Sequence, residues 1–279
     1  MSRIRDRGRK AGTFLLLISG ILLLPTLFRL LLIGRFDLGN DEAHYFMYAV
    51  HPALSYFDHP LMVALLIRTG MALFGTTAFG VRVFAPVLFF LSSAILMMIA
   101  LFLAPRRRVV LWTLFLVNAI PLFGYLGSML MLPDAPLSVF WLLYLLVALV
   151  LFIRYDRLSR GTRIQGWILL GSLLGLALLS KYNGILLAPA TFFFLLSTPE
   201  LRFLLRTPAP YLALLLGFLV AAPLFLWNLQ NGGASFLFQA THGLPGGYQL
   251  RLGALLPDWY FETIGYVSAN SLNRDPWAL

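Results

Sequence analysis

Long uninterrupted runs of apolar residues dominate the hydrophobic pattern of this chain. Crossing a bilayer takes about 20 apolar residues, fewer where a helix is short or distorted. Seven runs meet or approach that length: 12–33, 83–103, 109–126, 137–153, 166–180, 184–198 and 209–227. Because helices of water-soluble proteins carry only an apolar stripe, this pattern predicts an all-α fold, a polytopic bundle of transmembrane helices.

The fifth and sixth runs form one apolar stretch that is too long for a single ordinary helix. The segment "SKYNG" interrupts it, and Asn183-Gly184 is a turn signal. We therefore expect a tight hairpin at this dipeptide.

The amino-terminal run resembles a signal peptide, because a basic start precedes an apolar stretch. The stretch is longer than the usual signal core, and no A-x-A-like cleavage site follows it. We interpret it as an uncleaved first span.

Two loops on one side of the bundle are long. The loop 34–82 contains the amphipathic stretches "DEAHYFMYAV" and "PLMVALLIRTGMALFG", the second of which is too short to span and is interrupted by Arg68. We expect both to form helices that lie in the membrane interface. The second loop, 228–250, is polar and glycine-rich, and the tail after it is a poor span because of Asp258 and Glu262.

Composition supports the membrane interpretation. The 279 residues are 60% hydrophobic and 11% charged, with a mean hydropathy of +0.85. There are no cysteines, which excludes disulfides and thiol chemistry.

The net charge of +10 sets topology and does not indicate a nucleic-acid partner. With a cytoplasmic amino terminus, 14 of the 21 basic residues fall in inside segments. This bias is the positive-inside pattern of membrane proteins. The inside segments are 1–10, 104–108, 154–163 and 199–208.

Acids and histidines gather on the opposite, outer side. All four histidines and eight of the eleven acids lie there: Asp37, Asp41, Glu42, Asp58, Asp134, Asp258, Glu262 and Asp275. Acids contribute little to topology, so this sorting indicates a single active face on the outer side.

The adjacent acids Asp41 and Glu42 follow the first span. One interpretation is structural: Asn40 caps a helix, and acids in its first turn complement the helix dipole. The other is a general base at the membrane surface, where partial desolvation raises the pKa of a carboxyl group.

Three further positions carry candidate chemistry. In "YFDHPLM", Pro60 disfavours helical backbone at His59, and Asp58 with His59 forms either a structural Asx turn or a site for phosphate or a metal. Asp134 in "LPDAP" is either a turn acid or a functional acid beside the bilayer. Lys181 either extends toward the interface or holds an anionic lipid phosphate.

Together these residues fit transfer from a lipid phosphate, which needs cations for the phosphate and a carboxylate to activate an acceptor. A proton-coupled transporter of a lipid or solute is the alternative from another class. It would use acids inside the membrane, and no acid lies well inside the seven runs.

The ordered motifs carry a family resemblance. They are "DEAHYFMYAV", "LSYFDHPLMVALLIR", "GVRVFAPVL", "PDAPLSVFW", "LSKYNGILLAPA" and "WNLQNGGASFLFQATH", within about 34–245. This set resembles the bacterial protein-mannosyltransferase-like glycosyltransferases of GT-C fold, which are related to the lipid A aminoarabinose transferases.

The resemblance implies a sugar donor linked to polyprenyl or dolichyl phosphate, inverting transfer on the periplasmic face of the inner membrane, and a protein, lipid A or glycan acceptor. It implies that Asp41 is the catalytic base, with Glu42 as second acid and Asp134 as a further required acid.

For the donor side, the "YFDHP" segment resembles the family's "YFEKP". The resemblance therefore implies that Asp58 and His59 bind a divalent metal and the donor phosphate. We expect Arg82 and Lys181 to supply further phosphate contacts. Family members run well beyond 279 residues, so we also expect a carboxy-terminally truncated, and in the extreme an inactive, homologue.

Overall fold

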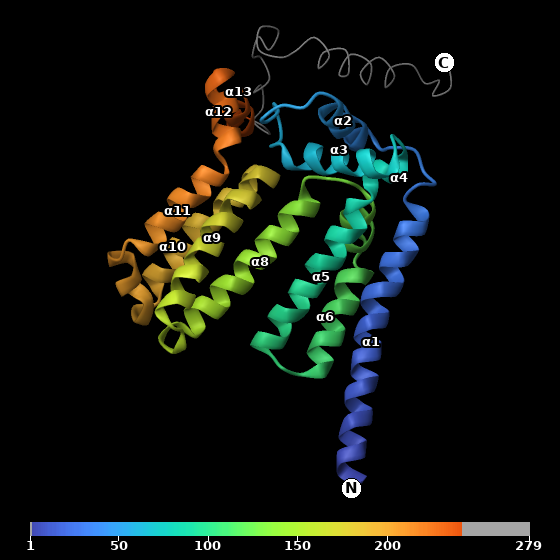
Figure 1. Cartoon of the computed structure of the whole chain (residues 1–279), viewed down its shortest axis with the longest axis vertical. Coiled ribbons are helices and arrows are strands. Elements are labelled where there is room, and N and C mark those ends of the chain that lie inside the picture. The colour runs from blue at the N-terminus through green and yellow to red at the C-terminus, as the bar shows by residue number, and fades with distance from the viewer. Residues whose placement is uncertain (1, 242–279) are drawn as a thin grey trace.

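The computed structural model describes the backbone of residues 2–241 and the side chains of residues 12–240. In this part of the chain the regular elements are all helical, so the expected all-α bundle is confirmed. Figure 1 shows long helices lying side by side, with the short helices of the first loop across one end.

Four helices are long and apolar enough to cross a membrane. They are α1 (Ser2–Leu32), α5 (Phe84–Leu103), α8 (Asp134–Ile153) and α9 (Arg160–Ser180). Three bent helix pairs would raise the number to seven if each pair were one span. These seven units overlap the seven apolar runs, and the number of spans itself stays a prediction.

The third apolar run is not one straight helix. Helix α6 (Arg107–Ala119) is followed by a π-helical turn (Leu122–Leu126) and α7 (Gly127–Met129), with a bend of 72°. Pro121 at the break has no N–H to continue the helix ladder. A Cβ on Gly124 would lie 1.9 Å from the Asn118 carbonyl oxygen, so the turn needs glycine there.

Arg29 of α1 secures this bend from inside the bundle. Its Nε and Nη2 donate to the Gly124 carbonyl at 3.2 and 2.9 Å, and Nη1 donates to Asn118 Oδ1 at 3.0 Å. The guanidinium also lies 4.6 Å from the centre of the Phe89 ring on α5. A buried arginine in an apolar helix is thus fully used to join three elements.

The expected hairpin at Asn183-Gly184 is wrong in detail. Helix α9 ends at Ser180, and both residues lie inside a 3-10 helix, Tyr182–Leu186, that leads into α10 (Leu187–Ser197). Gly184 packs so closely that a Cβ there would lie 2.5 Å from the backbone of Ala177. Lys181 has extended backbone between the two helices, and Gly184 allows the 3-10 helix to pack against the backbone of α9.

The last elements alternate between short helices and bends. A 3-10 helix, Pro199–Arg206, follows α10 at a bend of 120°, and α11 (Ala209–Val220) meets α12 (Ala222–Gln230) at 56°. Gly232 and Gly233 have positive φ and turn the chain into α13 (Ala234–Thr241). The remainder of the expected second loop, 242–250, lies outside the described residues.

Glycine allows α9 and α11 to pack backbone to backbone. A Cβ on Gly171 would lie 2.4 Å from the Ala213 carbonyl oxygen, and one on Gly175 would lie 2.6 Å from that of Gly217. The Gly171-x-x-x-Gly175 spacing puts both on one helix face, the usual way for membrane helices to approach closely.

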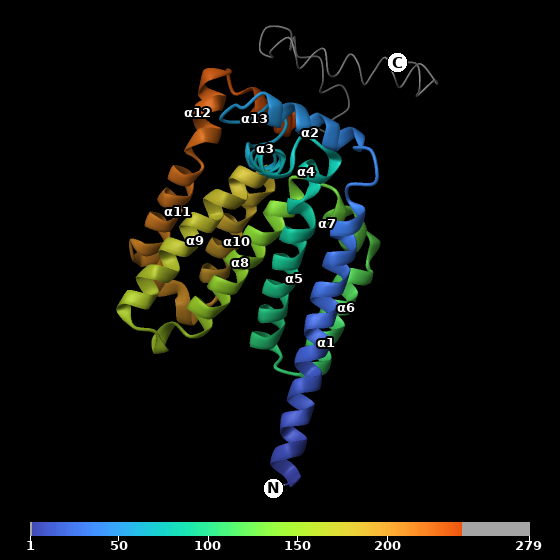
Figure 2. The ribbon, with the colours of Figure 1, turned by 45° about the vertical axis from the view of Figure 1, so that its right-hand side comes forward.

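The first loop folds into three helices at one end of the bundle. They are α2 (Asn40–Val50), α3 (Met62–Phe74) and α4 (Ala78–Arg82). Figure 2 shows them across the same end as α12 and α13. Both amphipathic stretches are therefore helical as expected, and Met62–Phe74 is too short to count as a span.

Candidate functional site

Asp41 and Glu42 begin α2 but point to different surroundings. Asp41 is exposed, and its carboxylate makes no hydrogen bond or ion pair with the described residues. Glu42 is buried, with 1% of its side chain exposed. The expected divergence of two adjacent helical side chains is what separates them.

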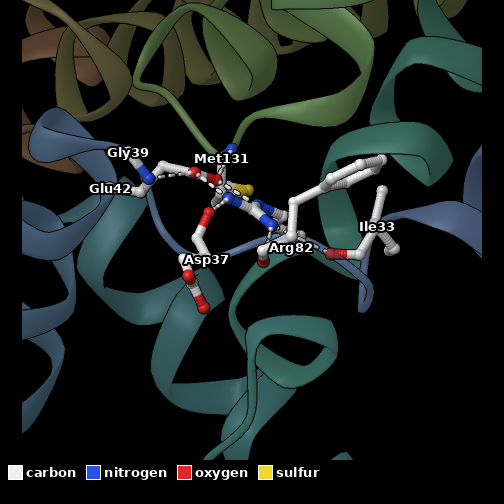
Figure 3. Close-up of polar contacts among 7 residues, drawn as sticks. Ile33, Asp37, Gly39, Glu42, Arg82 and Met131 are labelled. Atoms are coloured by element: carbon white, nitrogen blue, oxygen red, sulfur yellow. Dashed lines mark hydrogen bonds and ion pairs between the residues drawn. The ribbon is translucent and has the colours of Figure 1, made fainter. Parts of the chain in front are cut away.

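Glu42 and Arg82 form a buried brace, drawn in Figure 3. Arg82 Nε donates to Glu42 Oε1 at 2.8 Å and Nη2 donates to Glu42 Oε2 at 2.5 Å. The remaining Arg82 N–H groups donate to the carbonyls of Ile33, Phe36 and Asp37 at 2.7 to 3.0 Å. All five guanidinium N–H groups are therefore used.

Both carboxylate oxygens of Glu42 are also occupied by hydrogen bonds. Beyond Arg82 it accepts from the backbone N–H of Gly39 and of Met131, each at 3.1 Å. Gly39, and not Asn40 as expected, is the residue that caps α2. The brace joins the end of α1, the first loop, α4 and the segment before α8.

The brace corrects two sequence-based hypotheses. Glu42 has no carboxylate oxygen open to a substrate, and Arg82 has no N–H left for a donor phosphate. We therefore assign a structural role to both residues and no longer include them in the catalytic or phosphate-binding set.

Asp58 is the centre of a polar cluster beneath α2. The Tyr48 hydroxyl donates to Asp58 Oδ1, while His44 Nε2 and His59 Nδ1 lie 3.3 and 3.1 Å from Oδ2. His44 Nε2 also lies 2.7 Å from the Tyr48 hydroxyl. All three polar partners of the carboxylate are thus proton donors or titratable rings.

The backbone of the first loop presents this cluster. Ser55 and Pro60 form an isolated antiparallel bridge, and the Tyr56 N–H donates to the His59 carbonyl at 3.1 Å. This agrees with the extended backbone expected before Pro60. The Tyr56 ring stacks on Tyr48 at 4.0 Å and 7°, which orients the phenol that contacts Asp58.

The cluster keeps Asp58 ionised. Burial by itself would raise the pKa of the Asp58 carboxyl, but its contacts with His44 and His59 lower it further than burial raises it. The pKa of Asp58 consequently lies well below its usual range.

A divalent metal at Asp58 and His59 stays a prediction. Within residues 2–241, no group of three or more histidine, aspartate or glutamate side chains is arranged to hold a metal ion. The oxygens of Asp58 are already used by Tyr48 and the two histidines. We therefore assign no step of the reaction to a metal.

Asp134 and Lys181 meet at the end of the bundle. Lys181 Nζ lies 2.8 Å from both carboxylate oxygens of Asp134. Asp134 begins α8, and Lys181 follows the last residue of α9, so each charge complements its own helix dipole. The pair is open to solvent, with 54% of Asp134 exposed, which leaves it available to a ligand.

The phenol of Tyr45 is affected by the charges of three aspartates named in the sequence analysis. Burial raises the pKa of the Tyr45 phenol well above its usual value, and the charges of Asp58, Asp41 and Asp134 raise it further. These acids are far apart in the sequence, yet all act on one side chain. We take Asp41, Asp58 with His59, and Asp134 with Lys181 together as the candidate site, since all belong to the end of the bundle where the first loop folds.

Sequence reasoning missed several members of this site. Asp41, His44, Tyr45 and Tyr48 have the spacing i, i+3, i+4 and i+7, which puts them on one face of α2. That periodicity was a signal available in the sequence. No sequence signal marked Gln239 of α13, whose side-chain amide donates to the Asp58 carbonyl at 2.7 Å.

The chain is similar to known proteins in sequence and in fold. Residues 58–227 match the family described as dolichyl-phosphate-mannose-protein mannosyltransferase. The lipid A galacturonosyltransferase RgtD of Rhizobium johnstonii is 28% identical over 251 residues, which are 84% of this chain and 49% of that protein.

Two further proteins are similar. An undecaprenyl phosphate-alpha-4-amino-4-deoxy-L-arabinose arabinosyl transferase of Pseudomonas fluorescens is 28% identical over 200 residues, 70% of this chain and 28% of that protein. The crystal structure of ArnT from Cupriavidus metallidurans bound to undecaprenyl phosphate has the same fold. Its TM-score is 0.65 at 18% identity, over 83% of this chain and 44% of that one.

The chain thus spans about half or less of the length of these relatives.

Proposed function

The chain belongs to the dolichyl-phosphate-mannose-protein mannosyltransferase family, and from that premise we propose that it is a membrane glycosyltransferase that uses a polyprenyl-phosphate-linked sugar. The sugar would be transferred to an acceptor at the end of the bundle where the first loop lies. We further propose that this end faces the periplasm, with the amino terminus in the cytoplasm.

The observation that carries the proposal is the exposed carboxylate of Asp41, which has no hydrogen bond or ion pair among the described residues and lies at the start of the helix that also bears His44 and Tyr48. The neighbouring acid, Glu42, is buried in an ion pair with Arg82. Asp41 is therefore the acid of the two that an acceptor can reach. A general base needs an open position within hydrogen-bond reach of the proton it removes.

The proposed step balances as a single displacement. An acceptor hydroxyl or amine attacks the anomeric carbon of the donor while the bond from that carbon to the phosphate oxygen breaks. The electron pair leaves with the polyprenyl phosphate. The acceptor's proton passes to the carboxylate of Asp41.

The leaving phosphate needs positive charge, and two places can supply it. His59 and His44 are held as a pair by Asp58, and Lys181 lies at the ends of α8 and α9 with Asp134. A lysine acts on phosphate as a point charge, and histidines contribute when protonated. We propose that donor phosphate competes with Asp134 for Lys181.

The acceptor and the sugar are argued from the relatives alone. Their names include lipid A and the sugars galacturonate and 4-amino-4-deoxy-L-arabinose. We propose a sugar in this range, or mannose as in the family description, with lipid A, another glycan or a protein as acceptor.

Release of labelled sugar from the donor tests the proposal. The protein in nanodiscs would receive undecaprenyl phosphate carrying a radiolabelled sugar, with lipid A as acceptor. Wild type should release label, and Asp41→Asn should lower the rate by at least about a hundredfold, the usual contribution of a general base.

Asp37→Asn is the matched control, because Asp37 is another exposed carboxylate just before α2. It should leave the rate near that of wild type. Equal rates for Asp41→Asn and wild type would contradict the base assignment, and donor that binds wild type without release would contradict transfer by this chain.

A further inference from the structure

A second, separate site lies in the half of the bundle furthest from the first loop. A cavity of about 370 Å³ opens between α8, α9, α10 and α11. Figure 2 shows these helices together, away from α1. Most of the lining is apolar, including Leu170, Leu174 and Leu214.

The cavity opens to the side of the bundle. Phe192, Phe193 and Tyr211 line it, and between 45% and 63% of each residue is exposed. The apolar wall and the aromatic side chains at the mouth suit a hydrocarbon occupant. The occupant that this wall fits is therefore an acyl chain.

One polar group in the wall has no partner. The Trp167 side chain lines the cavity and is 6% exposed, and its indole N–H is buried without a hydrogen-bond partner. The other polar side chains deep in the wall, Tyr144 and Thr191, satisfy each other at 2.7 Å. This N–H is buried and is not open to the cavity, so the wall that an occupant would meet is almost wholly apolar.

Arginines continue the cavity-facing stripe of α9. One face of α9 carries five residues at helical spacing. Its first two positions are Arg160 and Arg163, and the next three, Trp167, Leu170 and Leu174, line the cavity. The stripe therefore passes from cations at the start of α9 to apolar wall within two turns.

The 3-10 helix Pro199–Arg206 carries further cations and is linked to the start of α9 through aromatic contacts. Arg163 lies 4.3 Å over the Tyr155 ring, and Tyr155 contacts Phe203 edge to face at 5.8 Å. Leu205 lines the cavity, and its neighbour Arg206 is exposed with no partner among the described residues. Arg160 is likewise exposed and unpaired.

The charge balance at this end is strongly positive. The segments 154–163 and 199–206 hold six arginines, and their only acids are Asp156 and Glu200. Basic pockets between membrane helices bind anionic lipid head groups. A charged rim next to an apolar cavity matches a molecule with an anionic head and a hydrocarbon chain.

We propose that this cavity is a binding site for an anionic phospholipid, with one acyl chain between α9, α10 and α11 and the phosphate at Arg160 and Arg206. The site does not depend on sugar transfer, since it lies at the opposite end of the helices from Asp41. Its occupant would hold the short, bent elements after α9 against the rest of the bundle.

Native mass spectrometry of the protein released from nanodiscs tests this proposal. Nanodiscs would contain equal amounts of phosphatidylglycerol and phosphatidylcholine. Wild type should retain phosphatidylglycerol preferentially. Arg160→Gln and Arg206→Gln should each lower that preference about fivefold, as expected for one cation at a membrane surface.

Arg106→Gln is the matched control, because Arg106 is an exposed arginine between α5 and α6, away from the cavity. It should leave the preference unchanged. Ala188→Trp, which places an indole in the cavity, should abolish retention of either phospholipid, and circular dichroism would confirm that it is folded.

Three results would overturn the proposal. They are equal retention of the two phospholipids by wild type, an equal loss in Arg106→Gln, or full retention by Ala188→Trp. Displacement of the phospholipid by undecaprenyl phosphate, dependent on Arg160 and Arg206, would assign the cavity to the donor lipid instead.

Discussion

At the scale of single residues, burial gives different roles to side chains of the same type. Asp41 and Glu42 are adjacent acids, but only Glu42 lies in the interior with Arg82. The cost of burying a charge is offset here by a bidentate ion pair and by backbone N–H donors. A residue in such a brace stabilises the site without reacting in it.

Glu42→Gln should destabilise the protein by about 3–5 kcal/mol, because it leaves Arg82 buried without its counter-charge. Thermal unfolding in detergent measures this. The double variant Glu42→Gln/Arg82→Met should lose less stability than the two single variants lose together. Additive losses would show that the two side chains do not act as a pair.

Asp58 should make stability depend on pH in the acid range. The pKa of Asp58 is lower in the folded protein than in the unfolded chain, so its ionised form stabilises the fold. This contribution to the free energy of unfolding is fully present above the unfolded-state pKa of about 3.9 and is lost as the pH falls below that value. Unfolding temperatures between pH 3 and 7 should therefore fall at the acid end for wild type.

Asp58→Asn should flatten that acid-end decrease, whereas Asp41→Asn should retain it, since Asp41 has no buried partner. The same slope in wild type and Asp58→Asn would contradict the assignment of this pH dependence to Asp58.

At the scale of elements, close helix contacts position the site. The backbones of α9 and α11 approach over glycines, and α9 carries Lys181 at its end toward Asp134 on α8. A side chain inserted between these backbones would separate the helices, because a carbonyl oxygen cannot move aside as a flexible side chain can.

Gly171→Ala should lower stability by about 1–3 kcal/mol through this overpacking. Gly20→Ala on α1 is the control, because the nearest atom to a Cβ there is a leucine methyl group at 4.0 Å. Unfolding temperatures of the purified variants give the comparison. A stable Gly171→Ala variant would mean that α9 and α11 can pack at a larger distance.

At the scale of the whole molecule, the charges predict orientation. Basic residues gather between helices at the end opposite the first loop, as the positive-inside rule requires for the cytoplasmic side. The absence of cysteine from the sequence makes the prediction simple to test, since one introduced thiol is the only one present.

In intact cells, a membrane-impermeant maleimide should label Asp37→Cys in the first loop. It should label Arg106→Cys and Gly161→Cys only after the membrane that holds the protein is permeabilised. Labelling of all three in intact cells, or the reverse pattern, would contradict the proposed orientation.

Much of this architecture follows from local pattern. Apolar runs of about 20 residues can satisfy their backbone groups in lipid only as helices, so their positions predict the bundle. Amphipathic spacing predicts α2 and α3, and the ordered motifs indicate the family. Sorting of charge by side is visible along the chain and predicts an outer face rich in acids and histidines; His242, Asp258, Glu262 and Asp275 of that set lie outside the described residues.

Other features exist only in three dimensions. The bend after α6 depends on a carbonyl of Gly124 that Arg29 holds from a distant helix. The pairing of Glu42 with Arg82 depends on contact between segments 40 residues apart, and that of Asp134 with Lys181 on the meeting of α8 and α9.

The sequence by itself therefore determined the class of fold, the helical segments and the set of residues from which a site could be built. The tertiary structure decided which of those residues are buried and satisfied and which remain open to a ligand. The physical reason is that periodicity is a property of neighbours in the chain, whereas desolvation and ion pairing depend on what packs against a side chain from elsewhere.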